Sequence, residues 1–508
     1  MPDNHASFKV FCRGGLNTSR DVLSQGEESP GSATQLINYE PSVTGGYRKI
    51  NGYQNDYGTV PGQGDVLGVA VANGINDGIL ACRNPSSGTN YLHHWDTGTE
   101  AWVAATTSGS PTMSGVTKVR FERINFTTPE VAIVDGINPA AVYDGTTYTQ
   151  ITDSNAPSAP KYVSGFQNHL FLAEGNKLYF SAPLAPTDFA PGNGAGVIQV
   201  GFTIVQIKAF RNDLYIFGSN AVKKLTGNNL ANFVVESVTD DLGCLASDSV
   251  IEIGGDLLFL SQDGLRPVAG TSKIGDVNLE TLSKDIQSIF SDVVFDVDLD
   301  GLNAVVVRQK SQFRIFLASA DTQGIIGGFR RTQEGMGLEF GQILGIAATC
   351  ADSGYIGQYE YVIHGDSTGK VYRQERGNSF DGEPIFSLYQ TPFFHMQDPE
   401  VRKTFDRVAT YLRSEGDNEI AFSVIFDYGD VETLSPSNYT LTTEGAAAYF
   451  NEATYDSTAI FDGNPSPVER TNISGSALSI ALKYVTNDTN ASHSIQGIVI
   501  TYGQGDRR

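Results

Sequence analysis

The sequence predicts an all-β protein, and three observations lead to this prediction. Short runs rich in Val, Ile, Phe, Tyr and Thr alternate with Gly, Asn and Asp turns along most of the 508 residues. A strand–turn–strand pattern recurs about every 40 to 50 residues. A single segment, residues 278–290, has apolar side chains at helical spacing, with Asn278 as a candidate N-cap. We therefore expect many short strands and one short helical insertion.

The repeated pattern predicts the architecture. Each copy has an apolar strand, a turn and a second strand, as in residues 166–180. Because a single four-stranded sheet leaves both of its faces exposed, such units stack in a ring, and the period is typical of the blades of a β-propeller. Seven copies are compatible with either six or seven blades, because one copy could be a stray hairpin. The copies, three clear and four weaker, are centred on Leu170, Leu214, Leu257, Ile79, Val131, Phe313 and Tyr361.

The pattern divides the chain into three regions. We expect an N-terminal arm with the first strands in residues 1–60, the β-propeller in 61–395 and a C-terminal β domain in 396–508. In the last region the repeat is lost, and longer strands alternate apolar with polar residues. Such strands are typical of a β-sandwich or of a strand-paired extension of the ring. One alternating set comprises Ile420, Phe422, Val424 and Phe426.

The composition argues against several functions. With 34 basic and 57 acidic residues, the net charge of −23 is unsuited to gripping nucleic acid, because phosphate binding needs clustered Lys and Arg. No apolar run is as long as a membrane-spanning helix, and the first residues do not resemble a secretory signal. Widely spaced cysteines are typical of buried thiols in a reducing compartment. The four are Cys12, Cys82, Cys244 and Cys350.

Motifs for catalysis and metal binding are incomplete. Residues 296–301 (DVDLDG) match the first half of a calcium loop, but Val307 stands where the bidentate glutamate belongs. His93 and His94 are adjacent on an expected strand, so they point to opposite faces. The sequence contains no signature of serine hydrolases, zinc proteases or P-loop NTPases. We therefore expect no enzymatic activity, no metal and no cofactor.

One basic cluster stands out in this acidic chain. It consists of Arg402, Lys403, Arg407 and Arg413. Charged side chains on an exposed strand protect a sheet edge from pairing with other chains, which is one interpretation. The other is a contact with an acidic neighbouring subunit, since opposite charges orient partners during association.

Short motifs over most of the chain resemble those of the tail nozzle proteins of short-tailed (podovirus-type) phages, also called packaged DNA stabilisation proteins. Near the start, the similar stretches are residues 11–17 (FCRGGLN), 29–33 (SPGSA), 36–38 (LIN) and 45–53 (GGYRKINGY). Later ones are residues 207–220 (IKAFRNDLYIFGSN), Gly243 with Cys244, residues 259–261, the segment 278–290, residues 389–394 (YQTPFF) and Phe405 with Asp406.

The resemblance implies both a fold and a function. It implies a six-bladed propeller and a homo-hexameric ring below the portal and adaptor proteins, with a tail needle or tail fibres as further partners. The ring would belong to the virion tail, assembled in the host cytoplasm, and would retain packaged DNA and conduct it during ejection. An acidic lumen would repel phosphate and let DNA slide without sequence-specific binding. No catalytic residues come with this family.

Two alternatives remain open at this point. A carbohydrate-active or carbohydrate-binding propeller, a glycosidase or a lectin, would use acids gathered at the central channel, for which Asp296, Asp298 and Asp300 are candidates. A fibre-anchoring tail hub would share the fold and differ only in its position in the particle.

Overall fold

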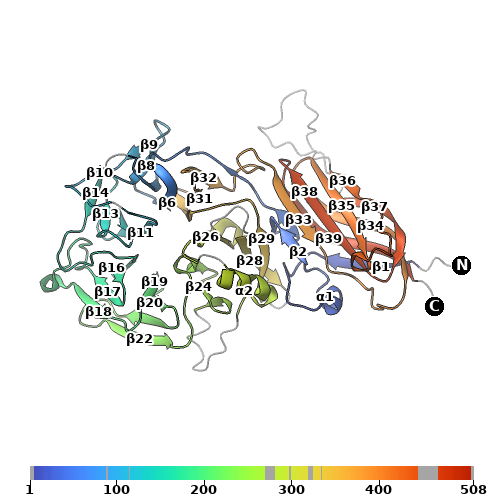
Figure 1. Cartoon of the computed structure of the whole chain (residues 1–508), viewed down its shortest axis with the longest axis horizontal. Helices are drawn as coiled ribbons and strands as arrows, with labels where there is room; N and C mark the ends of the chain where they lie inside the picture. The colour runs from blue at the N-terminus through green and yellow to red at the C-terminus, as the bar shows by residue number, and fades with distance from the viewer. Residues whose placement is uncertain are drawn as a thin grey trace.

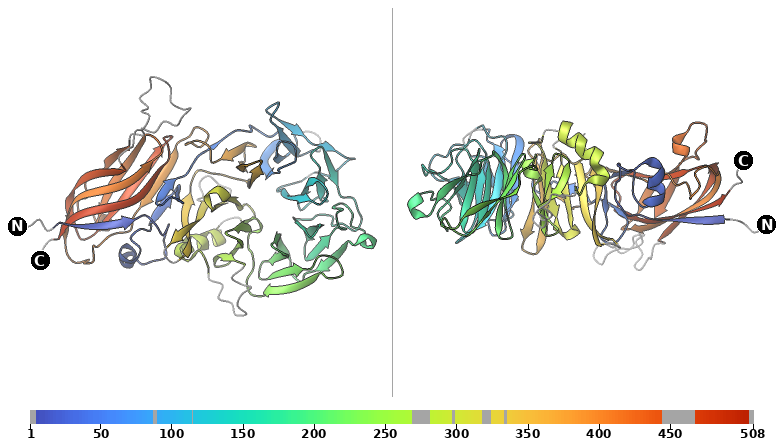
Figure 2. Two further views of the ribbon diagram at one scale, coloured as in Figure 1. Left: turned by 180° about the vertical axis from the view of Figure 1, so that it is seen from behind. Right: turned by 90° about the horizontal axis from the view of Figure 1, so that it is seen from below.

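The chain folds almost entirely into β-sheets, which confirms the expected all-β class. The computed structural model describes residues 5–86, 90–113, 115–268, 281–296, 299–317, 324–332, 335–443 and 467–504. Within these residues, 39 strands form eight sheets, beside two short α-helices. Figure 1 shows most of the sheets arranged around a common centre, with the last strands of the chain forming an elongated body at one side of this ring. The ring and this body lie side by side along the long axis of the molecule (Figure 2).

Seven groups of strands surround the centre (Figure 1). The first three groups are β6 (Gln63–Val71), β7 (Ile79–Asn84), β8 (Leu92–Asp96) and β9 (Ala101–Ala104); β11 (Arg120–Asn125), β12 (Pro129–Val134), β13 (Ala141–Tyr143), β14 (Thr147–Gln150) and β10 (Thr106–Thr107); and β15 (Tyr162–Phe166), β16 (His169–Glu174), β17 (Lys177–Phe180) and β18 (Gly196–Gln199).

The other four groups complete the ring. They are β19 (Ile204–Phe210), β20 (Asp213–Gly218), β21 (Val222–Thr226) and β22 (Val234–Thr239); β23 (Ile251–Ile253), β24 (Asp256–Ser261) and β25 (Gly264–Pro267); β26 (Asn303–Val307), β27 (Gln312–Phe316), β28 (Gly324–Thr332) and β29 (Gly335–Ile343); and β30 (Cys350–Ile356), β31 (Tyr359–Gly365), β32 (Val371–Gln374) and β5 (Tyr53–Gln54).

The second strand of each group is apolar on both faces because a neighbouring sheet covers each face. In β20, Leu214 and Ile216 belong to the core shared with the preceding group of strands. Tyr215 and Phe217 point the other way and pack in the core shared with β24, beside Phe259. Alternation along a strand thus fills two separate cores, which is why the repeat reads as near-continuous apolar runs.

All seven sequence repeats correspond to a group of strands. Each residue on which a copy was centred lies in the second strand of its group: β7, β12, β16, β20, β24, β27 or β31. Among the described residues there are therefore seven groups, and the expectation of six is corrected to seven. The count is seven because each of the four weaker copies of the repeat also forms a group of paired strands.

The first and seventh groups of strands lie against each other. Strand β5 precedes the first group in the chain, yet it pairs with β32, the last strand of the seventh group. Val69 and Ile79 of the first group share a core with Cys350 and Ile363 of the seventh. Strand β5, from the N-terminal part of the chain, therefore joins the last group of strands just before the first group begins.

The C-terminal strands form two facing sheets together with N-terminal strands. One sheet extends the sixth group through β2 (Gln35–Ile37), β33 (Ile385–Gln390), β38 (Ile480–Asp488), β35 (Asn418–Phe426) and β36 (Tyr439–Thr443). The other contains β3 (Tyr39–Pro41), β4 (Tyr47–Lys49), β39 (His493–Gln504), β34 (Lys403–Ser414) and β37 (Val468–Ala477), with β1 (His5–Phe11) paired to β39.

The core between these two sheets follows the alternation expected from the sequence. Ile420 and Phe422 of β35 are buried in the same core as Ile498 and Ile500 of β39. This core continues into the fifth and sixth groups of the ring, for example through Phe313 of β27. The extension is therefore built onto the ring by both strand pairing and a shared core.

The helices differ from expectation. Helix α2 spans Gln287–Asp296 after a 3₁₀ turn at Lys284–Ile286, so it begins and ends later than the expected segment, and Asn278 lies outside the described residues. A short helix that the sequence did not indicate, α1 (Val22–Glu28), begins after Asp21, whose carboxylate accepts two backbone N–H bonds of the first turn. Within the described residues, no helix is long and apolar enough to cross a membrane.

Candidate functional site

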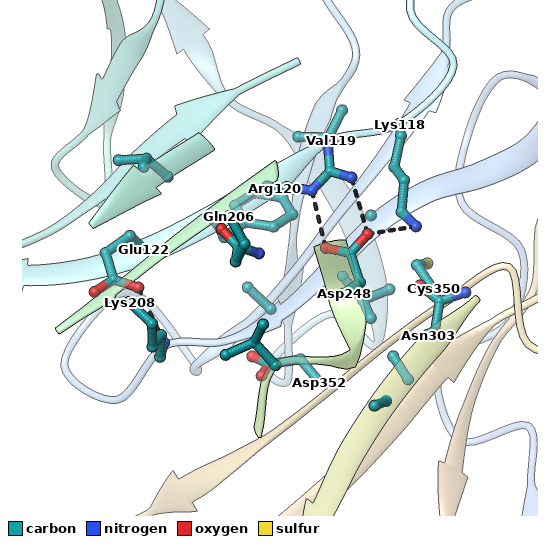
Figure 3. A pocket seen from close by; sticks show the side chains of 18 of the residues that line it. Lys118, Val119, Arg120, Glu122, Gln206, Lys208, Asp248, Asn303, Cys350 and Asp352 are labelled. Carbon is teal, nitrogen blue, oxygen red and sulfur yellow. Dashed lines mark hydrogen bonds and ion pairs between the residues drawn. The ribbon is translucent and has the colours of Figure 1, made fainter. Parts of the chain in front are cut away.

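A cavity of about 190 Å³ lies at the centre of the ring (Figure 3). Its wall contains residues of β6, β11, β15, β19, β26 and β30 and of the segment just before β23, so every group of strands contributes. Any chemistry at this centre depends on the charged side chains of its wall. These are Lys118, Arg120, Arg123, Lys208, Glu122, Asp248 and Asp352.

Asp248 is the most strongly held of these groups. It lies in the 3₁₀ turn Ser247–Ser249, directly before the fifth group of strands. Nε of Arg120 donates to Oδ1 at 2.9 Å and its Nη2 donates to Oδ2 at 2.9 Å, so the pair is bidentate. Lys118 Nζ lies 2.6 Å from Oδ2 (Figure 3). The Arg120 guanidinium also lies over the ring of Tyr162, 5.0 Å from its centroid.

These partners determine the protonation state of Asp248. Burial by itself would raise the pKa of this carboxyl, but Arg120 and Lys118 more than offset it and lower the pKa to about 2. Asp248 is therefore ionised at neutral pH and unsuited to donate a proton as a general acid. Burial also raises the pKa of the Cys350 thiol in the same wall to about 12, so this cysteine is a neutral thiol.

The remaining carboxylates of the cavity wall are also paired. Nζ of Lys208 lies 3.6 Å from Glu122 Oε2. Arg123 Nη2 lies 3.8 Å from Asp352 Oδ1, and the backbone N–H of Val71 donates to Oδ2 of the same Asp352 at 2.8 Å.

Strand β11 takes part in three of these ion pairs, because its Arg120, Glu122 and Arg123 have partners in or just before three other groups of strands. In the part of the chain that the structure describes, no cluster of three or more side chains could hold a metal ion. The arrangement of the charges therefore fits a structural link across the centre of the ring.

Of the three acids proposed from the sequence for a glycosidase channel, only Asp300 has a described side chain, and it is not part of the wall of this cavity. Asp296 is the last residue of helix α2, and Asp298 lies outside the described residues. The side chain of Asp300 is 83% exposed and lies 3.9 Å from Lys161 Nζ. Its backbone carbonyl accepts a hydrogen bond of 2.9 Å from Lys118, a residue of the cavity wall.

The structure separates the basic cluster that the sequence indicated. Lys403 is fully buried, donates to the backbone carbonyls of Asp398 and Leu478, and has its pKa lowered by this burial. Arg402 donates to the carbonyl of Ser476 at 2.8 Å. Strand β34 lies between β37 and β39, so the interpretation as a protected edge strand is wrong.

Arg407 and Arg413 remain exposed, and strand pairing adds two further cations to their face. Arg470 of β37 is paired with Ala409 of β34, and Ala409 is also paired with Val499 of β39. Val499 is in turn paired with Lys9 of β1, so these four residues form one row across the sheet. Residues directly opposite each other on paired strands point to the same side of a sheet. Exposed aromatic rings lie in the next row, where Phe11 is 64% and Tyr411 is 39% exposed.

We call this surface the basic sheet face. Within the described residues, none of its four cations lies within 4 Å of a carboxylate, whereas most interior cations of the chain are paired. The sequence alone could not assemble it, because Lys9 and Arg470 are more than 400 residues apart and only the register brings them together. It is defined by Lys9, Phe11, Arg407, Tyr411, Arg413 and Arg470.

Comparisons with known proteins give only distant structural similarities. No protein-family model and no curated protein matches the sequence. An extracellular domain described as part of a hybrid two-component system of B. thetaiotaomicron has a TM-score of 0.40 and 12% identity over 66% of this chain and 41% of that chain. An ancestral GH74 enzyme has a TM-score of 0.38 and 10% identity over 73% and 53% of the two chains. Similarity at this level assigns no function.

Proposed function

We propose that this chain is a structural protein of a short-tailed phage tail, of the nozzle or hub type, and that its ring is a seven-bladed β-propeller. The sequence motifs that resemble tail nozzle proteins support the first part. The seven stacked groups of strands, fastened by β5, support the second. The resemblance implied six blades, so this chain departs from the expected pattern in blade number.

The basic sheet face is the observation that carries the proposal. An acidic chain of net charge −23 presents, on one face of a sheet, two exposed aromatic rings and four cations that lie within 4 Å of no carboxylate of the described residues. Exposed aromatic and arginine side chains are enriched where proteins associate, and charge complementarity orients the partners. This face would meet an acidic surface of an adjoining copy, of the portal and adaptor proteins, or of a tail needle or fibre.

The central cavity supports a structural rather than a catalytic role. Its carboxylates are tied to cations, and Asp248 is held ionised by Arg120 and Lys118. A cavity of about 190 Å³ is far too small for a DNA duplex, so in this proposal the genome passes between copies of the chain and not through one ring. A lumen bordered by acidic copies would repel the phosphates and keep the DNA mobile.

A single charge reversal on the basic sheet face tests the proposal. Purified particles should contain the wild-type chain in a ring of copies with an open axial channel, visible by cryo-electron microscopy. Arg407→Glu should lower incorporation into particles, measured by quantitative mass spectrometry, and should lower infectious titre. Lys177→Glu on β17 is the matched control, since it makes the same charge change at an exposed lysine elsewhere.

Two results would contradict this function. The first is the absence of the chain from purified particles. The second is an incorporation of Arg407→Glu equal to that of Lys177→Glu. Association that depends on the basic sheet face should also weaken as salt rises, because exposed charges are screened over about 10 Å at 0.1 M ionic strength.

A further inference from the structure

A second and larger cavity lies where the first and seventh groups of strands meet, and its wall includes residues of β7, β8, β30, β31 and β32. Its volume is about 640 Å³, within the usual range of roughly 300–1,000 Å³ for small-molecule sites. The apolar part of its wall is formed by Tyr57, Ile79, Trp95, Ile356 and Tyr361. The charged part is formed by Asp56, Asp77, Glu100, Arg373 and Arg376.

Trp95 packs against other aromatic side chains in this wall. It faces Trp102 across the β8–β9 pair, with ring centroids 5.5 Å apart, and its ring lies 5.4 Å from that of Tyr57. Trp102 donates its indole N–H to the carbonyl of Tyr57 at 2.7 Å, which anchors the cluster. The indole N–H of Trp95 has no hydrogen-bond partner among the described residues, so a donor and an aromatic surface are left for a ligand.

The charged part of the wall offers both donors and acceptors. Arg373 lies over the ring of Tyr361, with its Cζ 3.8 Å from the ring centroid, and no carboxylate of the described residues lies within 4 Å of it. Arg376 Nε lies 3.7 Å from Asp56 Oδ2. Three carboxylates against two guanidinium groups give the wall a net charge of −1.

We propose that this cavity binds a neutral saccharide. The face of an aromatic ring is electron-rich, and the C–H groups of a sugar ring can pack against it. Sugar hydroxyls can accept hydrogen bonds from Arg373 and Trp95 and donate to Asp77 or Glu100. A purely apolar ligand would bury these charged groups without partners, at a high cost in free energy. A polyanion would be repelled by the three carboxylates.

This site goes beyond the proposed structural function. The cavity lies within one chain, so its formation does not depend on the assembly of several copies into a ring. A tail protein that carries it could recognise glycans of a cell surface, while a chain outside a phage particle would still bind them. The two proposals therefore fail independently.

Tryptophan fluorescence gives a direct test, because the chain contains two tryptophans and both belong to this cluster. The full chain is screened on an array of neutral and acidic bacterial oligosaccharides, and the neutral glycan that binds best is titrated. The variant Trp102→Phe should still bind, with Trp95 as its single reporter, and should show a saturable change in emission. Trp95→Ala and Arg373→Gln should each weaken binding about tenfold or more.

Controls separate loss of the site from loss of the fold. Arg373→Gln leaves the tryptophan packing intact, and Lys177→Gln changes an exposed cation outside the cavity. Circular dichroism and thermal melting should show both variants folded. The proposal is overturned if no neutral glycan binds the wild-type chain at millimolar concentration, if only acidic glycans bind, or if folded Arg373→Gln binds as tightly as Lys177→Gln. Normal incorporation of Arg373→Gln into particles would leave the structural proposal untouched.

Discussion

Replacing Asp248 by Asn should destabilise the ring at its centre. The substitution keeps the size of the side chain and removes the charge that holds Arg120 and Lys118 together. Both cations are largely buried, with side chains 11% and 18% exposed, so water compensates them poorly. The loss should therefore exceed that from an ordinary surface substitution.

The magnitude follows from the pKa of Asp248. The ordinary value of 3.8 falls to about 2 in the folded chain, although burial alone would raise it. Each pKa unit corresponds to about 1.4 kcal/mol, so the folded state favours the ionised carboxylate by about 2 to 3 kcal/mol. We expect Asp248→Asn to lower the free energy of unfolding at pH 7 by this amount.

Urea titrations of the wild-type chain and of Asp248→Asn measure the difference. The control is Asp65→Asn, because Asp65 is exposed and makes no ion pair within the described residues. Because the folded pKa is lowered, the stabilisation by Asp248 is complete above about pH 4 and is lost as the pH falls towards 2. The difference between wild type and Asp248→Asn should therefore shrink as the pH falls from about 4 to about 2.

This reasoning is refuted if Asp248→Asn lies within about 0.5 kcal/mol of Asp65→Asn at pH 7, the range of ordinary surface substitutions. It is also refuted if the difference from wild type is constant from pH 7 to pH 3. Either result would mean that the central ion pairs add nothing to the stability of the ring.

Three further predictions concern the packing of the chain. Arg314 is 1% exposed and forms ion pairs with Glu375 and Glu40. Arg314→Met should lower the free energy of unfolding by about 3 kcal/mol in denaturant titrations, because two carboxylates lose a buried partner. Gly243→Ala should lower the melting temperature, since the added Cβ would lie 2.2 Å from the carbonyl oxygen of Gly218; a Tm equal to wild type would contradict this. A thiol reagent such as Ellman's should label no cysteine in the native chain and four in urea, because burial raises the pKa of each thiol; native labelling would contradict the buried positions of Cys12, Cys82, Cys244 and Cys350.

The strands were predictable because their signals are local. Alternation, β-branched residues and turn glycines indicated β16, β20 and β24 with their hairpins, and the structure has them there. The helix at 278–290 was misplaced because Leu282 fits a helical spacing but its N–H bonds the carbonyl of Leu265 in β25 instead. A tertiary hydrogen bond thus overrides a periodic pattern, as it does wherever local preference is weak.

The candidate sites were less predictable than the strands. Arg407 and Arg413 were recognised from the sequence, whereas Lys403, beside them, is buried, because a residue's position on one face or the other depends on register and on bulges in β34. Asp248 carried no signal of its own, since its role depends on Arg120, 128 residues away.

The sequence by itself determined that this chain is all-β and built from a repeat, because strand, turn and alternation are properties of neighbouring residues. The tertiary structure decided that seven groups of strands form the ring, that β5 fastens it, and that Lys9 and Arg470 share a face with Arg407. The physical reason is distance along the chain: β5 and β32 are more than 300 residues apart, Lys9 and Val499 are 490 apart, and Arg470 and Ala409 are 61 apart. Local patterns contain no information about which distant strands will pair.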